Sequence, residues 1–238
     1  MTPRRDTAAF ALAAALLGLT ALTSTAVRAR DAAHPTVVEL FQSQGCSSCP
    51  PANANLLAII DRPGILALSF GVTYWDSLGW KDTFASPQYT ARQWSYAHGL
   101  HHDNVFTPQM VINGRRDGVG VDAKALQTLI AEGDRGVGGP TITLRGGAVR
   151  VSAAATAAPA DVWLVRYDPR VVLVPIKRGE NGGKTLPHRN VVRELSRLGK
   201  WQGQAENFAI ARAGDPALRT AILVQVPRGG AIIAAATS

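Results

Sequence analysis

Residues 45–50 read Gly-Cys-Ser-Ser-Cys-Pro, and this phrase contains both cysteines, Cys46 and Cys49, of the 238-residue chain. An apolar run typical of a buried strand, residues 37–41, precedes the phrase, and a run with helical spacing, residues 53–61, follows it. A Cys-x-x-Cys pair at such a junction places the first sulfur near the unpaired N–H groups of a helix N-terminus, which stabilise a thiolate. The second sulfur lies one turn along, within reach of the first. The phrase therefore predicts thiol–disulfide chemistry.

Strand and helix patterns alternate around this phrase. Strands and helices are expected, in chain order, at residues 37–41, 53–61, 65–70, 87–98, 110–112, 116–119 and 123–132. The Asn113-Gly114 pair predicts a hairpin turn between the last two strands. The order β-α-β-α-β-β-α over residues 36–135 predicts an α/β domain, with any ligand site at the carboxyl ends of its parallel strands.

A glycine-rich linker, residues 136–140, separates this domain from a second pattern. Beyond the linker, apolar residues alternate in short runs, which favours strands. These strands are expected within residues 142–151, 162–167, 171–176, 221–226 and 231–234, with one short helix at residues 190–198. Residues 140–238 are therefore predicted to form a smaller, β-rich C-terminal module.

The N-terminus has the pattern of a targeting segment. Arg4 and Arg5 precede an alanine-rich apolar run, residues 8–26, and Val27-Arg28-Ala29 offers a small-residue cleavage site. We therefore predict that residues 1–29 are a signal peptide and that the mature protein is periplasmic or secreted. An uncleaved anchor is the alternative, because the run is long enough to span a bilayer. No later run is, so no stable membrane association is expected after cleavage.

Composition narrows the choice of partners and chemistry. The formal net charge of +8 comes from scattered residues without a nucleic-acid-binding motif, so no nucleic-acid partner is expected. Nor is a cofactor expected, because residues 177–184, though rich in glycine and lysine, lack the spacing of a phosphate-binding loop and fit a hairpin turn. No nucleophile or metal motif of a hydrolase is present. In an exported protein, the two cysteines are expected to form a disulfide with each other.

The element order resembles the thioredoxin fold once Thr107-Pro108 is included, because this pair stands immediately before the third strand. The resemblance implies that the Thr107–Pro108 bond is cis, which is rare in folded proteins. It also implies that Thr107 and Pro108 lie beside the disulfide and bind extended polypeptide substrates. Cys46 and Cys49 are then the catalytic pair.

A closer resemblance rests on three phrases, residues 39–51, 74–82 and 178–183. They resemble a family of secreted bacterial thioredoxin-like proteins that is catalogued only as a domain of unknown function. This resemblance implies a fold and a location for everything after the signal peptide, and it implies no established activity.

The expected activity is that of a thiol–disulfide oxidoreductase. Cys46, nearer the helix start and more exposed, is predicted to attack, and Cys49 to resolve the mixed disulfide. Protein thiols or disulfides are the expected substrates, and the sequence does not identify the redox partner. Glu39 lies on the strand where thioredoxins often bury an acidic residue behind the disulfide, but the side to which it faces is open.

Three alternatives remain for the same residues. The cysteines could form a static structural disulfide, although so short a loop contributes only about 2 kcal/mol. They could bind copper or zinc with further ligands, and the candidates for these are His98, His101, His102 and Met110. The aromatic segment with Tyr74, Trp75 and Trp80 could dock a peptide or ligand, or it could cap the sheet or pack against the C-terminal module.

Overall fold

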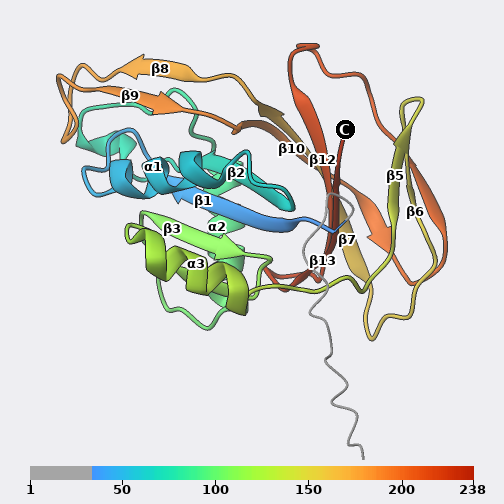
Figure 1. Ribbon diagram of the computed structural model, residues 1–238. Helices are drawn as coiled ribbons and strands as arrows, with labels where there is room; N and C mark the ends of the chain where they lie inside the picture. The colour runs from blue at the N-terminus through green and yellow to red at the C-terminus, as the bar shows by residue number, and fades with distance from the viewer. Residues whose placement is uncertain (1–33) are drawn as a thin grey trace, which may run out of the picture.

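The computed structural model describes residues 34–238, and the predicted signal peptide, residues 1–29, lies outside them. The elements are β1 (Thr36–Gln42), α1 (Cys49–Ile59), β2 (Ile65–Gly71), the short 3-10 helix η1 (Asp76–Leu78), α2 (Pro87–Gly99), β3 (Gln109–Ile112), β4 (Arg116–Gly118), α3 (Ala123–Glu132), β5 (Ile142–Arg145), β6 (Ala148–Val151), β7 (Ala160–Asp168), β8 (Val172–Pro175), β9 (Thr185–His188), β10 (Val191–Trp201), β11 (Glu206–Ala209), β12 (Arg219–Gln225) and β13 (Ile232–Thr237). The protein is thus a mixed α/β structure with few helices (Figure 1).

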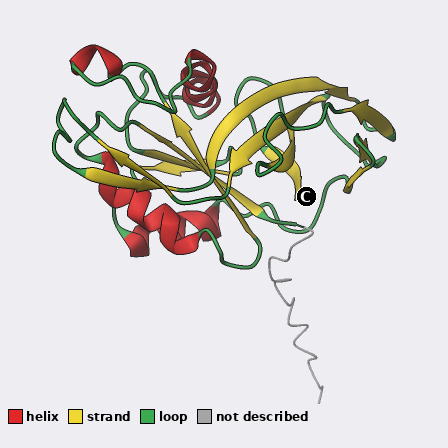
Figure 2. Cartoon of the chain, turned by 90° about the horizontal axis from the view of Figure 1, so that it is seen from above, coloured by secondary structure: helices red, strands yellow, loops and turns green. Residues whose placement is uncertain are grey.

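One large mixed sheet organises the molecule. Its eight strands run in the order β13-β12-β7-β10-β2-β1-β3-β4 within the described residues. β1 is parallel to β2 and antiparallel to β3, which is in turn antiparallel to β4. Helices lie on both sides of this part of the sheet (Figure 2).

Side chains alternate between the two faces of β1, and both faces are buried. Val38 and Leu40 pack with residues of α1 and α3, whereas Val37 and Phe41 pack with residues of α2 on the opposite face. A strand buried on both faces is expected to be almost entirely apolar, and in residues 37–41 only Glu39 departs from this pattern. This double cover fixes α1, and the cysteine phrase before it, against one face of the sheet.

The C-terminal strands extend the same sheet from the outer side of β2. β10 pairs in parallel with β2 at Val191 and Ser69, and the Asn190 side-chain amide donates a 2.8 Å hydrogen bond to the Ala67 carbonyl. β7 and β12 then continue the sheet in antiparallel fashion. The two predicted units therefore share one sheet, and one core cluster includes residues from both.

Two smaller sheets complete the fold. The three-stranded sheet β11-β6-β5 covers the outer half of the large sheet around the fully buried Trp201. The β8–β9 hairpin instead runs along α1, at the opposite end of the molecule (Figure 1). No helix within residues 34–238 has the length and apolar character that a membrane crossing requires.

The short helix predicted at residues 190–198 is wrong, because this segment is part of the long strand β10. Val192, Leu195 and Leu198 are spaced by three, which suggests a helix. The structure explains this spacing by two register shifts against β7, between Val192 and Glu194 and between Arg197 and Gly199. Each bulge adds a residue to the strand and so breaks the two-residue alternation.

Candidate thiol–disulfide site

Cys46 and Cys49 form a disulfide where β1 leads into α1. Cys46 lies in the turn that follows β1, and Cys49 is the first residue of α1, with its N–H donating to the Cys46 carbonyl at 3.2 Å. Proline occupies the first helical turn, where its missing N–H costs no helical hydrogen bond. The sequence therefore starts the helix directly at the second sulfur.

The loop before β3 lies against the disulfide, as the family resemblance implied. The Thr107–Pro108 peptide bond is cis, which confirms that prediction. The Thr107 hydroxyl donates to Cys46 Sγ at 3.4 Å, and Ser48 Oγ donates to the Thr107 carbonyl at 3.4 Å. The structure thus brings together all four predicted site residues at the N-terminus of α1.

Both sulfur-bearing residues are buried: Cys46 is 0% exposed and Cys49 is 1% exposed. The prediction that Cys46 is the more exposed cysteine is therefore wrong. The intervening Ser47 and Ser48 are exposed instead. The physical reason is that segments distant in sequence pack around the cysteine phrase, and a local pattern cannot reveal this.

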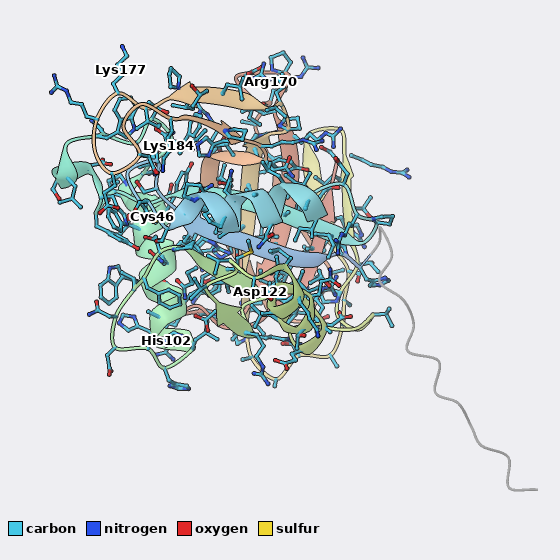
Figure 3. The ribbon with its side chains drawn as sticks, turned by 60° about the vertical axis from the view of Figure 1, so that its left-hand side comes forward. Cys46, His102, Asp122, Arg170, Lys177 and Lys184 are labelled. Carbon is cyan, nitrogen blue, oxygen red and sulfur yellow. A yellow bond between two sulfur atoms is a disulfide. The ribbon has the colours of Figure 1, made fainter. Side chains whose placement is uncertain are left out.

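The β8–β9 turn (residues 176–184) is one of these segments (Figure 3). Glu180 Oε2 accepts a hydrogen bond from the Ser47 N–H at 2.9 Å. The fully buried Asn181 amide donates to the Gln44 carbonyl at 3.0 Å and to the Cys46 carbonyl at 2.8 Å. The predicted hairpin turn is present, and it binds the backbone on both sides of Cys46.

Sequence analysis missed Glu180 and Asn181 as site residues. Their phrase, residues 178–183, contributes to the family resemblance and fits a hairpin turn, but nothing in it indicates a contact with the cysteines. Gly179 adds to the fit, because it has a positive φ of 75° and a Cβ there would lie 3.3 Å from the Cβ of Trp80.

Two of the predicted aromatic residues are bound into the site. Trp75 Nε1 donates to the Thr107 hydroxyl at 2.7 Å, and Trp80 Nε1 donates to Gln44 Oε1 at 2.9 Å. These rings therefore brace the loops around the disulfide. Tyr74 and Leu78 remain exposed beside them, at 37% and 55%.

A buried carboxyl group, Asp82, supports the turn before Cys46. Its Oδ2 atom accepts a 2.7 Å hydrogen bond from the Gln44 N–H, and its Oδ1 atom accepts one of 2.7 Å from the Phe84 N–H. Burial raises the pKa of Asp82, although these N–H groups oppose the rise. By contrast, the hydrogen bond from Ser47 holds the pKa of the exposed Glu180 below its usual value.

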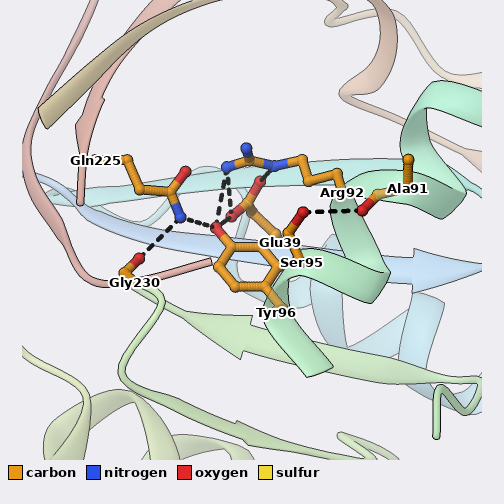
Figure 4. Close-up of polar contacts among 7 residues, drawn as sticks. All are labelled: Glu39, Ala91, Arg92, Ser95, Tyr96, Gln225 and Gly230. Carbon is orange, nitrogen blue, oxygen red and sulfur yellow. Dashed lines mark hydrogen bonds and ion pairs between the residues drawn. The ribbon is translucent and has the colours of Figure 1, made fainter. Parts of the chain in front are cut away.

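Glu39 faces away from the disulfide. It is fully buried on the α2 side of β1, where Arg92 Nε donates to it at 2.8 Å and the Tyr96 hydroxyl also donates to it (Figure 4). Gln225 Nε2 donates to the Tyr96 hydroxyl at 3.1 Å, which ties β12 into the same network. Burial raises the pKa of Tyr96 well above its usual value, so this hydroxyl stays protonated. Glu39 is therefore part of a structural ion pair.

A cavity of about 140 Å³ lies between Cys49, at the start of α1, and the strand β9. Its polar lining includes Gln42, Asn53 and His188, and Gln42 Nε2 donates to Asn53 Oδ1 at 3.0 Å. His188 is 3% exposed, and its Nε2 atom has no hydrogen-bond partner within the described residues. Burial lowers the pKa of His188 to about 4, so the ring is neutral at physiological pH.

The predicted alternative metal ligands are not gathered around the cysteines. His102 Nε2 pairs with Asp117 at 2.9 Å, His98 packs against Trp94, and Met110 is fully buried in the core. Within residues 34–238, no three His, Cys, Asp or Glu side chains are placed so that they could hold a metal ion.

Solved structures resemble this chain over most of its length. Protein AGR_C_4864 from Agrobacterium tumefaciens is 31% identical, with 85% of this chain and 92% of that chain covered and a TM-score of 0.69. HBP35 of Porphyromonas gingivalis is 14% identical, with 86% and 74% covered and a TM-score of 0.60, which is a likeness of fold alone. No curated protein matches the chain.

Residues 37–225 match the family described as "Protein of unknown function (DUF1223)". The match begins in β1 and ends at the last residue of β12, so it includes both the cysteine phrase and the β8–β9 turn. The chain belongs to the DUF1223 family.

Proposed function

We propose that the protein is an exported, thioredoxin-like thiol–disulfide oxidoreductase that acts through Cys46 and Cys49. The observation that carries the proposal is the contact of Thr107, which precedes a cis-proline, with Cys46 Sγ at the start of a helix. A disulfide that only fastened a loop would need neither this neighbour nor this position. In the proposed function, Thr107 and Pro108 present backbone to an extended substrate.

The arrangement of residues 36–132 supports the thioredoxin-like part of the proposal. The elements follow the order expected for such a domain, and its strands lie in the order β2-β1-β3-β4. Function does not follow from fold, so the fold only supplies a setting in which the cysteine pair has a helix N-terminus beside it.

The proposed reaction is a two-step exchange. A substrate thiolate attacks Cys46 Sγ, forms a mixed disulfide and displaces the Cys49 thiolate; a second substrate thiolate then attacks the substrate sulfur and releases Cys46. Two electrons pass from the substrate dithiol to the protein disulfide, and the two protons pass to the protein thiols. In the reverse direction the reduced pair reduces a substrate disulfide by the same steps.

The structure adds one requirement to this reaction, which is that a substrate sulfur must be able to reach Cys46. Since Cys46 is 0% exposed, an attacking sulfur reaches it only after a neighbouring segment moves. The β8–β9 turn is the segment we assign, because two residues, Glu180 and Asn181, make its side-chain hydrogen bonds to the cysteine phrase, and the bond to Glu180 is exposed to solvent. Local openings of such segments cost less free energy than global unfolding.

Trapping tests the activity directly. In a Cys49→Ala variant, a mixed disulfide between Cys46 and a substrate cannot be resolved, so disulfide-linked species should accumulate in a periplasmic extract. Cys46→Ala is the matched control and should trap none. Absence of trapped species, together with a reduction potential below about −300 mV, would show an inert structural bridge.

A static structural disulfide is the second candidate, and the burial of both cysteines favours it. The two candidates differ in the reduction potential, because catalytic pairs lie at about −120 to −270 mV. Stability does not separate them, because closing this short loop contributes about 2 kcal/mol in either case.

Export is the remaining part of the proposal. It is supported by the two arginines and the alanine-rich run that precede Val27-Arg28-Ala29. Intact mass measurement of the protein from a bacterial periplasm tests it: cleavage after Ala29 should remove residues 1–29. Recovery of the uncleaved chain in the membrane fraction would instead indicate an anchor.

A further inference from the structure

The Glu180 carboxylate lies at the start of α1, beside the first cysteine. Its Oε2 atom accepts the hydrogen bond from the N–H of Ser47, the residue that directly follows Cys46. This bond keeps the pKa of Glu180 below its usual value, so the carboxylate is ionised at neutral pH. The negative charge of Glu180 is therefore hydrogen-bonded to the peptide group that follows Cys46, the residue whose sulfur the proposed exchange uses.

This position opposes what a helix N-terminus normally does for a cysteine. Free N–H groups at the start of a helix stabilise a thiolate. The Ser47 N–H is instead directed at Glu180, and the carboxylate repels any negative charge that develops on Cys46. This repulsion raises the free energy of the reduced form of the pair, because Cys46 carries the negative charge in that form.

The neighbouring charged groups are one further acid and the cations Lys177, Arg178 and Lys184 of the same turn, and within residues 34–238 none of them is hydrogen-bonded to a cysteine sulfur. Asp82 is a second acid, bound to the backbone N–H of Gln44, and burial raises its pKa. The Lys184 ammonium donates to Asn181 Oδ1 at 3.0 Å, so it is one side chain removed from Cys46.

The remaining elements around the site add no cation at the sulfurs. α1, residues Cys49–Ile59, contains no charged residue. The Tyr74 hydroxyl contacts Thr107, and partial desolvation raises the pKa of this phenol, so it stays neutral. His102 and Asp117 pair with one another. Within residues 34–238, the polar groups in contact with Cys46 Sγ are uncharged hydroxyl groups, those of Ser48 and Thr107.

We propose that Glu180 lowers the reduction potential of the Cys46–Cys49 pair and so shifts its reaction towards giving electrons to substrate disulfides. Glu180 is a positioning residue that acts through Ser47 and through its charge; it does not touch the substrate. The inference rests on the proposed function, because a direction of electron flow has meaning only if the pair turns over.

The favoured direction balances as follows. The Cys46 thiolate attacks a substrate disulfide and displaces one substrate thiolate, and the Cys49 thiolate then attacks Cys46 Sγ and displaces the other. The protein dithiol loses two electrons and two protons, and the substrate disulfide becomes a dithiol. A carboxylate that destabilises the reduced protein makes this transfer more favourable.

Glu180→Gln isolates the charge, because the glutamine carbonyl can still accept the bond from the Ser47 N–H. In the reduced variant, the ionisation midpoint of Cys46, followed by ultraviolet absorbance of the thiolate, should fall by about half a pH unit. Above that midpoint, the equilibrium with a dithiothreitol or glutathione redox buffer should shift about threefold towards the dithiol, or about 15 mV. Glu180→Lys should shift both quantities further in the same direction.

Glu206→Gln is the matched control, since it removes the same charge from an exposed position of β11. It should leave both quantities at the wild-type values. The Glu180→Gln shift should also shrink as salt is added, which a structural change would not do. Equal midpoints and equal potentials for wild type and Glu180→Gln would overturn the inference.

These measurements use small-molecule redox buffers and no protein substrate. They therefore decide the role of Glu180 separately from the Cys49→Ala trapping experiment. Successful trapping with no shift in Glu180→Gln would leave the proposed function standing and remove the inference. A shift without trapping would show that Glu180 changes the potential of a pair that does not turn over, and the inferred direction of electron flow would then be wrong.

Discussion

The side-chain amide of Asn181 donates a 2.8 Å hydrogen bond to the carbonyl oxygen of Cys46, across 135 residues of sequence. The same amide also binds the Gln44 carbonyl, so one buried side chain clamps both ends of the turn that leads to the disulfide. The C-terminal half of the chain thereby holds the cysteine phrase in place.

Asn181→Ala should make the disulfide easier to reduce. The change removes two hydrogen bonds and leaves two carbonyl oxygens without their partner, which should lower the free energy of unfolding by about 2–3 kcal/mol. Reduction by dithiothreitol should be several times faster than in wild type, as followed by thiol labelling and mass spectrometry. Asn207→Ala, on the exposed face of β11, is the control. An unchanged reduction rate would show that the β8–β9 turn does not limit access.

Thr107→Val should destabilise the Cys46 thiolate. The substitution keeps the shape of the side chain but removes the hydroxyl that donates to Cys46 Sγ. The ionisation midpoint of the reduced protein should therefore rise, opposite to the change expected for Glu180→Gln. Thr107→Ser retains the hydroxyl and should restore the wild-type midpoint. A wild-type midpoint in the valine variant would contradict this role.

Glu39→Gln should weaken the fold without altering the redox pair. The change leaves the Arg92 guanidinium buried without its counter-charge, which typically costs about 3–5 kcal/mol. Urea denaturation should show this loss, whereas Glu132→Gln on the exposed end of α3 should stay within about 0.5 kcal/mol of wild type. The reduction potential of folded Glu39→Gln should equal that of wild type; a clear shift would indicate coupling between Glu39 and the disulfide.

His188 should make the folded protein less stable as the pH falls below neutral. Burial lowers its pKa from the usual 6.5 to about 4, so the unfolded chain binds a proton in this interval that the folded chain does not. Stability therefore rises with pH between about 4 and 6.5 and is lost on acidification, by at most about 3 kcal/mol at 1.36 kcal/mol per pKa unit.

The pH effect is isolated by comparing wild type with His188→Gln. Protonation of carboxyl groups such as Asp168, whose pKa is lowered by Arg170, also destabilises the folded protein in acid. This contribution should be the same in wild type and in the variant. The difference in unfolding free energy between the two proteins should change between pH 7 and pH 4. A constant difference would show that His188 titrates normally.

Much of the region around the disulfide could be predicted from local sequence. The junction of β1 with α1 follows from an apolar run, two cysteines and a proline, and the predicted cis bond at Pro108 followed from a family resemblance. These features depend on residues close together in the chain, or on a position relative to a strand. The mixed α/β class was predictable for the same reason.

Contacts that depend on distant residues could not be predicted. Glu180 and Asn181 reach the cysteine phrase across more than one hundred residues, as the separations of 133 and 135 show. The sequence does not show which face of β1 carries Glu39, because β1 is buried on both faces and its residues do not alternate between polar and apolar. The burial of Cys46 follows from these same distant contacts.

The attachment of β10 to β2 has a consequence for any attempt to shorten the protein. β2 reads Ile-Leu-Ala-Leu-Ser-Phe-Gly, and a chain cut at residues 136–140 would turn it into an edge strand. Such an edge, apolar and with unpaired N–H and C=O groups, is a template for pairing between molecules. We therefore expect the half that carries the cysteines to associate when it is produced alone, unless another strand covers β2.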